Sequence, residues 1–164
     1  MELSALIQEL INYISIEVTV LLTAAMPIIE LRGAIPVGIS LGLSPIHATV
    51  ISFIGSMIPV PFILFTIRPV FNALKQTKTF DKLIHKLVHR SLGKSGRIQK
   101  YGAWGLLVFV AIPLPGTGIW SGSLAAALLD MRFKWAFPAI LVGNFIAAVL
   151  IFALSHGVVS FMGA

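Results

Sequence analysis

Two apolar segments of this chain are each interrupted by a short stretch rich in proline and glycine, and these breaks constrain the fold more than any other feature. The first segment covers residues 18–43 and breaks at 27–36, and the second covers 101–129 and breaks at 112–118. Irregular backbone at membrane depth leaves peptide groups unpaired, so it persists only where protein buries it or where it lines a polar cavity. Paired interruptions in two halves of a chain are typical of a transporter binding site. The sequence therefore predicts that function is located at the two breaks.

Composition places the chain in a membrane. Hydrophobic residues make up 57% of the 164 residues, charged residues make up 11%, and the mean hydropathy is +0.97. A water-soluble domain carries roughly 25% charged residues, so this chain has too few to cover a soluble surface. We expect one membrane domain over residues 1–164, without a cleavable signal because Glu2 and Glu9 stand where such a signal is basic. The absence of cysteine excludes disulfides and thiol chemistry.

The basic residues are concentrated in one stretch. Nine of the twelve lysines and arginines lie within residues 68–100. A pI near 10.1 raises the hypothesis of nucleic-acid binding, but in a membrane protein such a loop is more simply the cytoplasmic one. Within it, residues 79–92 alternate apolar and basic positions at helical spacing, which predicts an amphipathic helix. We expect residues 71–100 to be a cytoplasmic linker on the inner leaflet, or alternatively a lipid-sensing or partner-binding element.

Two segments are long enough to cross a bilayer without a break. Ile46–Ile67 and Trp135–Leu154 are apolar over about the 20 residues that a crossing needs. Ser44 and Pro45 predict the start of the first helix, and Pro59 and Pro61 predict a kink within it.

The interrupted segments have two interpretations. Arms of roughly 11–14 residues are too short to span alone, so each segment is either a hairpin that returns to its own side or a broken helix that passes through. Hairpins put eleven of the twelve basic residues on one side. We therefore predict an all-α integral membrane protein with two re-entrant helical hairpins and two transmembrane helices. Residues 69–100 and 131–134 are then cytoplasmic, and both termini lie outside.

The hairpin arrangement makes the two halves, 1–70 and 101–164, an inverted-topology repeat. Pro27 matches Pro113 at an offset of 86, and residues 54–56 match residues 142–144 at an offset of 88. An insertion of two residues near 130–134 would reconcile the two offsets. Inverted repeats are a common basis of alternating access.

The first break carries charge, and the second offers backbone groups and hydroxyls. Ionisable residues at membrane depth mark pathways, proton relays or paired sites. Glu30 and Arg32 therefore form either a substrate or proton site or a mutual ion pair that locks the hairpin, unless they lie at the membrane interface. The second break starts a short helix whose free N–H groups suit an anion, with Thr117, Ser121 and Ser123 adding hydroxyls, unless it is only a tight turn. The predicted binding residues are Glu30, Arg32, Gly33, Pro36, Pro113, Pro115, Gly116, Thr117, Gly118, Trp120 and Ser121, with Glu30 also coupling protons.

Other patterns favour packing over chemistry. Gly38 and Gly42, like Gly118 and Gly122, are small residues four apart, which let helices approach closely in lipid. His85 and His89 are one helical turn apart, which could bind a metal, but they lie on the lysine-rich helix without a third ligand. No catalytic triad, P-loop or dinucleotide motif is present. We expect no catalytic residues, no cofactor and no metal, and an intramembrane lipid enzyme lacks a nucleophile–base set.

The two breaks resemble the signatures of a known family. Residues 30–36, with Gly38 and 41–43, resemble the first signature of the small multi-drug export proteins, and residues 113–122, with 124–126, resemble the second. That family is in turn similar to the DedA membrane proteins. The resemblance implies a bacterial inner-membrane, multi-pass protein with opposed re-entrant hairpins. Some DedA proteins translocate polyprenyl-phosphate carriers with an ion gradient, but they place arginines around the second proline, where this chain has no charge.

The resulting hypothesis is a small DedA-like transporter with one site formed by two facing hairpins. It would move an amphipathic small molecule or a lipid-phosphate carrier, coupled to an ion gradient. The alternative is a non-transporting membrane scaffold whose breaks serve packing only. The expected partners are membrane lipids, the substrate and a second copy of the chain in a homo-oligomer, with no nucleic acid.

Overall fold

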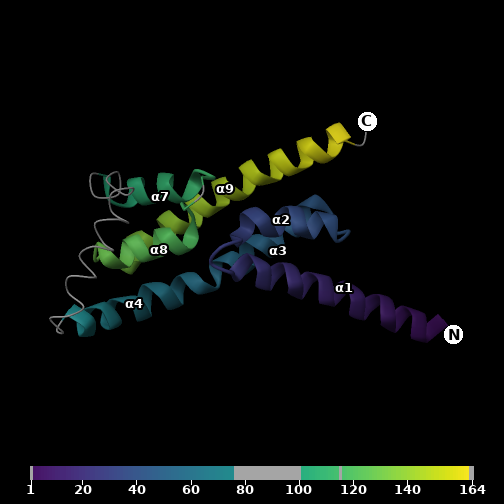
Figure 1. Cartoon of the computed structure of the whole chain (residues 1–164), viewed down its shortest axis with the longest axis horizontal. Helices are drawn as coiled ribbons and strands as arrows, with labels where there is room; N and C mark the ends of the chain where they lie inside the picture. The colour runs from purple at the N-terminus through teal and green to yellow at the C-terminus, as the bar shows by residue number, and fades with distance from the viewer. Residues whose placement is uncertain (1, 76–100, 115, 163–164) are drawn as a thin grey trace. The chain divides into compact units, whose positions relative to one another are not determined.

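The computed structural model describes residues 2–75, 101–114 and 116–162, and every regular element in these ranges is an α-helix (Figure 1). In chain order the helices are α1 (Glu2–Ala25), α2 (Glu30–Ser40), α3 (Pro45–Met57), α4 (Pro59–Lys75), α7 (Ala103–Ala111), α8 (Ile119–Leu128) and α9 (Phe133–Met162). The amphipathic helix expected at residues 79–92 lies outside the described residues.

Three helical segments of the described chain are long and apolar enough to cross a bilayer. They are Ile7–Ala25, Pro45–Ile67 and Phe133–Gly157. The two crossings expected from the sequence are among them. The helix is interrupted directly before Pro59, because α3 ends at Met57 and α4 begins at Pro59. The kink expected at Pro59 and Pro61 stays a prediction. The helix then continues past Arg68 to Lys75.

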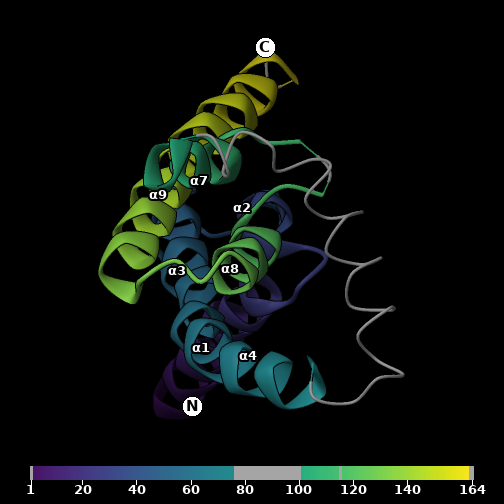
Figure 2. The ribbon, with the colours of Figure 1, turned by 90° about the vertical axis from the view of Figure 1, so that its left-hand side faces the viewer.

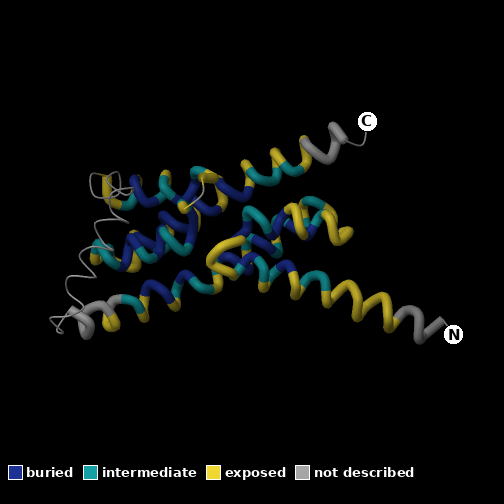
Figure 3. Tube along the Cα trace, viewed as in Figure 1, coloured by how far each residue is buried: buried dark blue, intermediate teal, exposed yellow. Residues whose placement is uncertain are grey.

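The first arm of the first interrupted segment is longer than expected. The sequence predicted a short arm starting near residue 18, but α1 extends over 24 residues from Glu2, so the expectation of two helices long enough to cross is wrong. Polar residues such as Gln8, Glu9 and Asn12 lower the hydropathy of this stretch without stopping a helix, and neither proline nor glycine occurs before Pro27. Residues 7–15 of α1 are exposed (Figure 3). Val20 and Ala24 of the same helix are buried.

The chain forms two compact units, each described separately. The first unit contains α1, α2, α3 up to Ser56, and α9 from Ala148 onward. Its core joins Val20 and Ala24 of α1 to Ala34 of α2, Leu43 and Ala48. Helix α2 packs against α1, and a Cβ atom at Gly38 would lie 3.2 Å from a methyl group of Val20. The first break therefore turns the chain back along α1.

The second unit lies within Met57–Ala147. Here α8 packs against both α4 and α7 and lies between them (Figures 1 and 2). The core is shared by four helices, with Val60 and Leu64 from α4, Leu106 and Val110 from α7, Ile119, Ala125 and Ala126 from α8, and Ala136, Ala139 and Ile140 from α9. A Cβ atom at Gly122 would lie 2.6 Å from a methyl group of Val110, so α8 is pressed onto α7.

In each unit a glycine of a long helix lies directly against the backbone of the preceding interrupted segment. A Cβ atom at Gly55 of α3 would lie less than 3.0 Å from the carbonyl oxygen of Leu21, and one at Gly143 of α9 would be 2.6 Å from that of Leu107. Real Cβ atoms essentially never come that close to backbone. Only glycine allows these two helix pairs to pack as they do.

The short helices α2 and α8 end in the same way. Leu43 N–H bonds to the carbonyl of Gly38, and Met131 N–H bonds to that of Ala126, each at 3.0 Å. The residue before each donor has a positive φ, +96° at Gly42 and +52° at Asp130. This is the Schellman end of a helix, in which one left-handed residue closes the last turn. Gly42 is thus a turn residue, and no atom lies near the position that its Cβ atom would take. The expectation that Gly42 packs against another helix is therefore wrong. Gly38 and Gly122 do pack against neighbouring helices, as expected.

Candidate functional site

The first break is a short turn that reverses the chain between α1 and α2. It covers residues 26–29, and two backbone bonds hold it, from Met26 N–H to Thr23 O at 3.2 Å and from Glu30 N–H to Met26 O at 3.1 Å. Pro27 cannot donate a backbone hydrogen bond, so it favours an end to α1 here. No side chain caps the start of α2, and its first N–H group, that of Glu30, is bonded within the turn.

Glu30 is the most constrained residue of the first break. Its φ is +53°, an unusual conformation for a residue with a side chain, and only 6% of its surface is exposed. Arg32, two residues later, is partly buried. The Glu30 carboxylate is near enough to the Arg32 guanidinium to interact with it electrostatically. This proximity fits both a substrate or proton site and a mutual ion pair that locks the hairpin.

Gly33 and Pro36 shape the short helix that follows. A Cβ atom at Gly33 would collide with a methyl group of the Ile29 side chain, so a larger residue here would require Ile29 to move. Pro36 lies inside α2 and is exposed. It has no N–H to give to the carbonyl of Arg32, which weakens the helix next to the charged residues.

The second break is held by the hydroxyl group of Thr117 together with two backbone bonds, from Leu114 N–H to Ile112 O at 2.9 Å and from Thr117 N–H to Leu114 O at 3.1 Å. Helix α7 ends at Ala111 and Ile112 is extended. The Thr117 hydroxyl lies 2.7 Å from the carbonyl oxygens of both Ile112 and Leu114, and it accepts a bond from Leu114 N–H at 3.3 Å. The hydroxyl carries one proton, so the two carbonyls share it. In this structure Thr117 ties the loop around Pro113, where the sequence had suggested a hydroxyl directed at a substrate.

Two glycines give the second break its path. Gly116 has φ +83° and Gly118 has φ +136°, which side chains rarely allow. Gly118 is buried and starts α8 without a side-chain cap, so its main role is to begin the helix. Trp120 and Ser121 are partly buried on the first turn, and the Ser123 hydroxyl is fully buried without a hydrogen-bond partner. The short helix start expected here is confirmed, whereas Pro115 lies outside the described residues.

We expect Thr117→Val to loosen the second break, because valine has the same shape but cannot tie the two carbonyls. The loss of a partly exposed hydrogen bond costs about 0.5–1.5 kcal/mol, so the melting temperature in detergent should fall by a few degrees. Thr117→Ser keeps the hydroxyl and should melt close to the parent chain. A valine variant as stable as the serine variant would show that the hydroxyl does not hold this loop.

The predicted site residues fall into two groups. Glu30, Arg32, Gly33 and Pro36 lie together at the start of α2 in the first unit. The remaining described residues lie together between α7 and the first turn of α8 in the second unit, namely Pro113, Gly116, Thr117, Gly118, Trp120 and Ser121.

One polar pair of the first unit escaped the sequence analysis. Glu17 of α1 lies 2.7 Å from the Nε2 atom of His47 in α3, both partly buried, and the ring of Tyr13 contacts that of His47 edge-on. The spacing of residues 13, 17, 20 and 24 gave a signal, because it puts Glu17 on the helix face that includes buried Val20 and Ala24. No group of three metal-ligating side chains occurs in the described ranges.

Comparisons with known proteins identify one family. The model of a family described as putative small multi-drug export protein matches residues 30–150, which include both breaks. The comparisons with curated proteins and with solved structures found no match.

Proposed function

The chain belongs to the putative small multi-drug export protein family, and from this premise we propose that it is a small transporter whose substrate pathway passes the two helix breaks. The family name indicates export rather than catalysis, and the apolar helices indicate a membrane protein.

The observation that carries the proposal is the pair of close backbone contacts at Gly55 and Gly143. Each glycine follows the first residue of its long helix, Pro45 or Phe133, by ten residues. At 1.5 Å per residue this is about 15 Å, or half of the roughly 30 Å apolar core of a bilayer. Because the first arm touches each glycine and ends four residues later, at Ala25 or Ala111, both breaks would lie inside the membrane. Uncapped helix starts and a buried carboxylate at that depth favour a polar pathway.

The same contacts support an internal repeat. Leu21 and Leu107, which touch the two glycines, are 86 positions apart, whereas the glycines themselves and the Schellman donors Leu43 and Met131 are 88 apart. The change of offset falls between Pro113 and Ala126. The two extra residues therefore belong to the second break region, not to residues 130–134 as the sequence suggested.

We further propose that each interrupted segment is a re-entrant hairpin and that the halves insert with opposite orientation, as in the DedA-like arrangement. The length of α1 is compatible with this. If Leu21 lies at mid-depth, then about ten residues of α1 reach the surface, and the exposed residues before them extend beyond it.

The topology of this arrangement can be measured on the natural background, which contains no cysteine. In intact cells, Lys94→Cys and Lys134→Cys should resist an impermeant maleimide, whereas Gly163→Cys should react, because the basic residues stay cytoplasmic. Labelling of both lysine positions after the cells are opened controls for reactivity. Labelling of the Lys134→Cys variant from outside would mean that residues 101–129 cross the membrane, which contradicts the hairpin.

In this proposal both hairpins bind substrate, with Glu30 carrying a proton or a cationic group and the start of α8 holding an anionic one. An amphipathic small molecule or a lipid phosphate has both characters. The test is flux in proteoliposomes that contain the whole chain and a trapped pH-sensitive dye. Tetraphenylphosphonium or a polyprenyl phosphate should drive proton movement that empty liposomes lack, and the absence of flux with both probes would contradict the proposal.

A further inference from the structure

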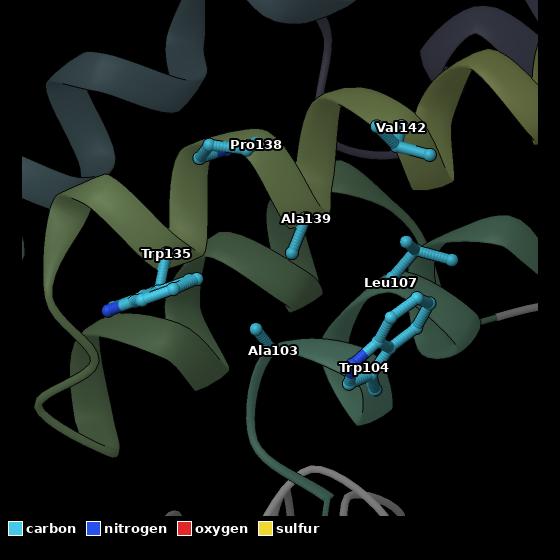
Figure 4. A pocket seen from close by; sticks show the side chains of 7 residues that line it. All are labelled: Ala103, Trp104, Leu107, Trp135, Pro138, Ala139 and Val142. Carbon is cyan, nitrogen blue, oxygen red and sulfur yellow. The ribbon is translucent and has the colours of Figure 1, made fainter.

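A groove between α7 and α9 is the most distinctive surface of the second unit outside the breaks. It has a volume of about 230 Å³ and is lined by Ala103, Trp104 and Leu107 of α7 and by Trp135, Pro138, Ala139 and Val142 of α9 (Figure 4). Its lining is almost wholly apolar. In a membrane protein such a surface faces acyl chains.

The two tryptophans distinguish this groove from an ordinary lipid-facing surface. Trp104 is 75% exposed and Trp135 is 60% exposed. Both lie toward the beginning of their helices, and Figure 4 shows α7 and α9 contributing side chains from both sides of the groove. Trp135, eight residues before Gly143, lies about 12 Å from the mid-depth proposed above, near the lipid headgroups, where an apolar ring and a polar N–H are both satisfied. Trp104, three residues before Leu107, lies deeper, among the acyl chains.

The groove also has a direction. The early residues Ala103 and Trp135 line one part of it, and the later residues Leu107 and Val142 line the other, so α7 and α9 run the same way along it. Arg132 and Lys134 stand at the beginning of α9, both exposed and neither in an ion pair with a described residue, and the Lys134 amino group lies 5.9 Å from the centre of the Trp135 ring. Asp130, also exposed, precedes them, so the local formal charge is +1. One end of the groove is thus cationic and the remainder is apolar.

We propose that this groove is a binding site for one anionic phospholipid, with an acyl chain along α7 and α9 and the phosphate headgroup at Arg132 and Lys134. This occupant fits because an anionic lipid has a negative headgroup to match the cationic end and an apolar acyl chain to match the rest of the groove. A second groove, lined by Ile46, Thr49, Val50, Val149 and Phe152 in the first unit, has no indole and no cation in its lining and lacks this selectivity. The inference requires membrane residence but not transport.

The test uses the two indoles as reporters. In the full chain with Trp120→Phe, only Trp104 and Trp135 emit, and lipids brominated on their acyl chains quench an indole that they contact. We expect brominated phosphatidylglycerol to quench at least threefold more effectively, at equal mole fraction, than brominated phosphatidylcholine. Equal quenching by the two lipids would overturn the proposal.

Two sets of variants separate the headgroup from the groove. In the double variant Arg132→Gln, Lys134→Gln, the ratio of quenching by phosphatidylglycerol to quenching by phosphatidylcholine should fall close to one. Quenching by phosphatidylcholine itself should persist. Ala103→Phe, which fills the groove but keeps both cations, should also remove the preference. If the preference for phosphatidylglycerol survives the charge variants, the assignment of the headgroup to Arg132 and Lys134 is overturned. If it survives Ala103→Phe, the lipid is attracted to the surface cations alone and the groove is not its binding site. Helicity measured by circular dichroism confirms that each variant is folded.

Discussion

Gly55→Ala and Gly143→Ala should each destabilise the protein severely, although alanine is normally a better helix former than glycine. The added methyl group would lie less than 3.0 Å from a backbone carbonyl oxygen, of Leu21 in one case and Leu107 in the other. Backbone inside a packed helix pair cannot rotate away as a side chain can, so the cost should reach or exceed the upper range for overpacking, about 3 kcal/mol. For a domain of this size that is roughly 6–12 °C in melting temperature.

The chain provides a matched control for these substitutions. Gly157 lies in α9, the same helix as Gly143, and a Cβ atom there would have open space around it. Gly157→Ala should therefore be neutral or stabilise by up to about 1 kcal/mol, because only helix propensity changes. Similar losses at Gly55 and Gly143 would support the proposed repeat. Stability within error of the Gly157→Ala variant at either position would show that the helices do not pack as closely as described.

The breaks could be predicted from the sequence because proline and glycine act locally. Pro27 and Pro113 cannot donate a backbone hydrogen bond, and the interruptions occur at these residues in both segments. The same reasoning located the interruption at Pro59. It failed at the beginning of α1, where polar residues lower the hydropathy but do not end a helix.

Features that depend on tertiary contacts were only partly predictable. Small residues four apart suggested packing at Gly38, Gly42, Gly118 and Gly122. Gly42 and Gly118 instead have a positive φ, Gly42 at the end of α2 and Gly118 at the start of α8. Their sequence neighbourhood does not distinguish these roles. The contact of Glu17 with His47 joins residues 30 positions apart, and only the fold of α1 against α3 brings them together. The internal bonds of Thr117 likewise depend on the exact turn geometry.

Glu30→Gln should abolish substrate-driven proton flux while leaving expression intact. Glu30 is buried at the start of α2 and its charge interacts with Arg32. Glutamine keeps the shape and the hydrogen-bonding groups but cannot take up or release a proton. We expect flux driven by tetraphenylphosphonium or a polyprenyl phosphate to fall at least tenfold, to the level of empty liposomes, if Glu30 carries the coupling proton.

A second carboxylate of the same unit distinguishes coupling from a general effect of charge. Glu17 lies on α1, partly exposed and in contact with His47, outside the proposed pathway. Glu17→Gln should leave the flux within about twofold of the parent chain, because coupling depends on the proton at Glu30 and not on the net charge of the unit. Equal losses in both variants would instead indicate damage to the fold of the first unit.

The scaffold alternative makes the opposite prediction for Glu30→Gln. If Glu30 serves only to neutralise Arg32, its substitution leaves a partly buried guanidinium without its counter-charge, which is a stability defect. The melting temperature would then fall, and a ligand would stabilise neither protein. In the transport interpretation, a ligand that binds the native state raises the melting temperature of the parent chain by mass action. Loss of flux without loss of stability in Glu30→Gln would therefore assign the carboxylate to transport, whereas unchanged flux with lower stability would assign it to packing.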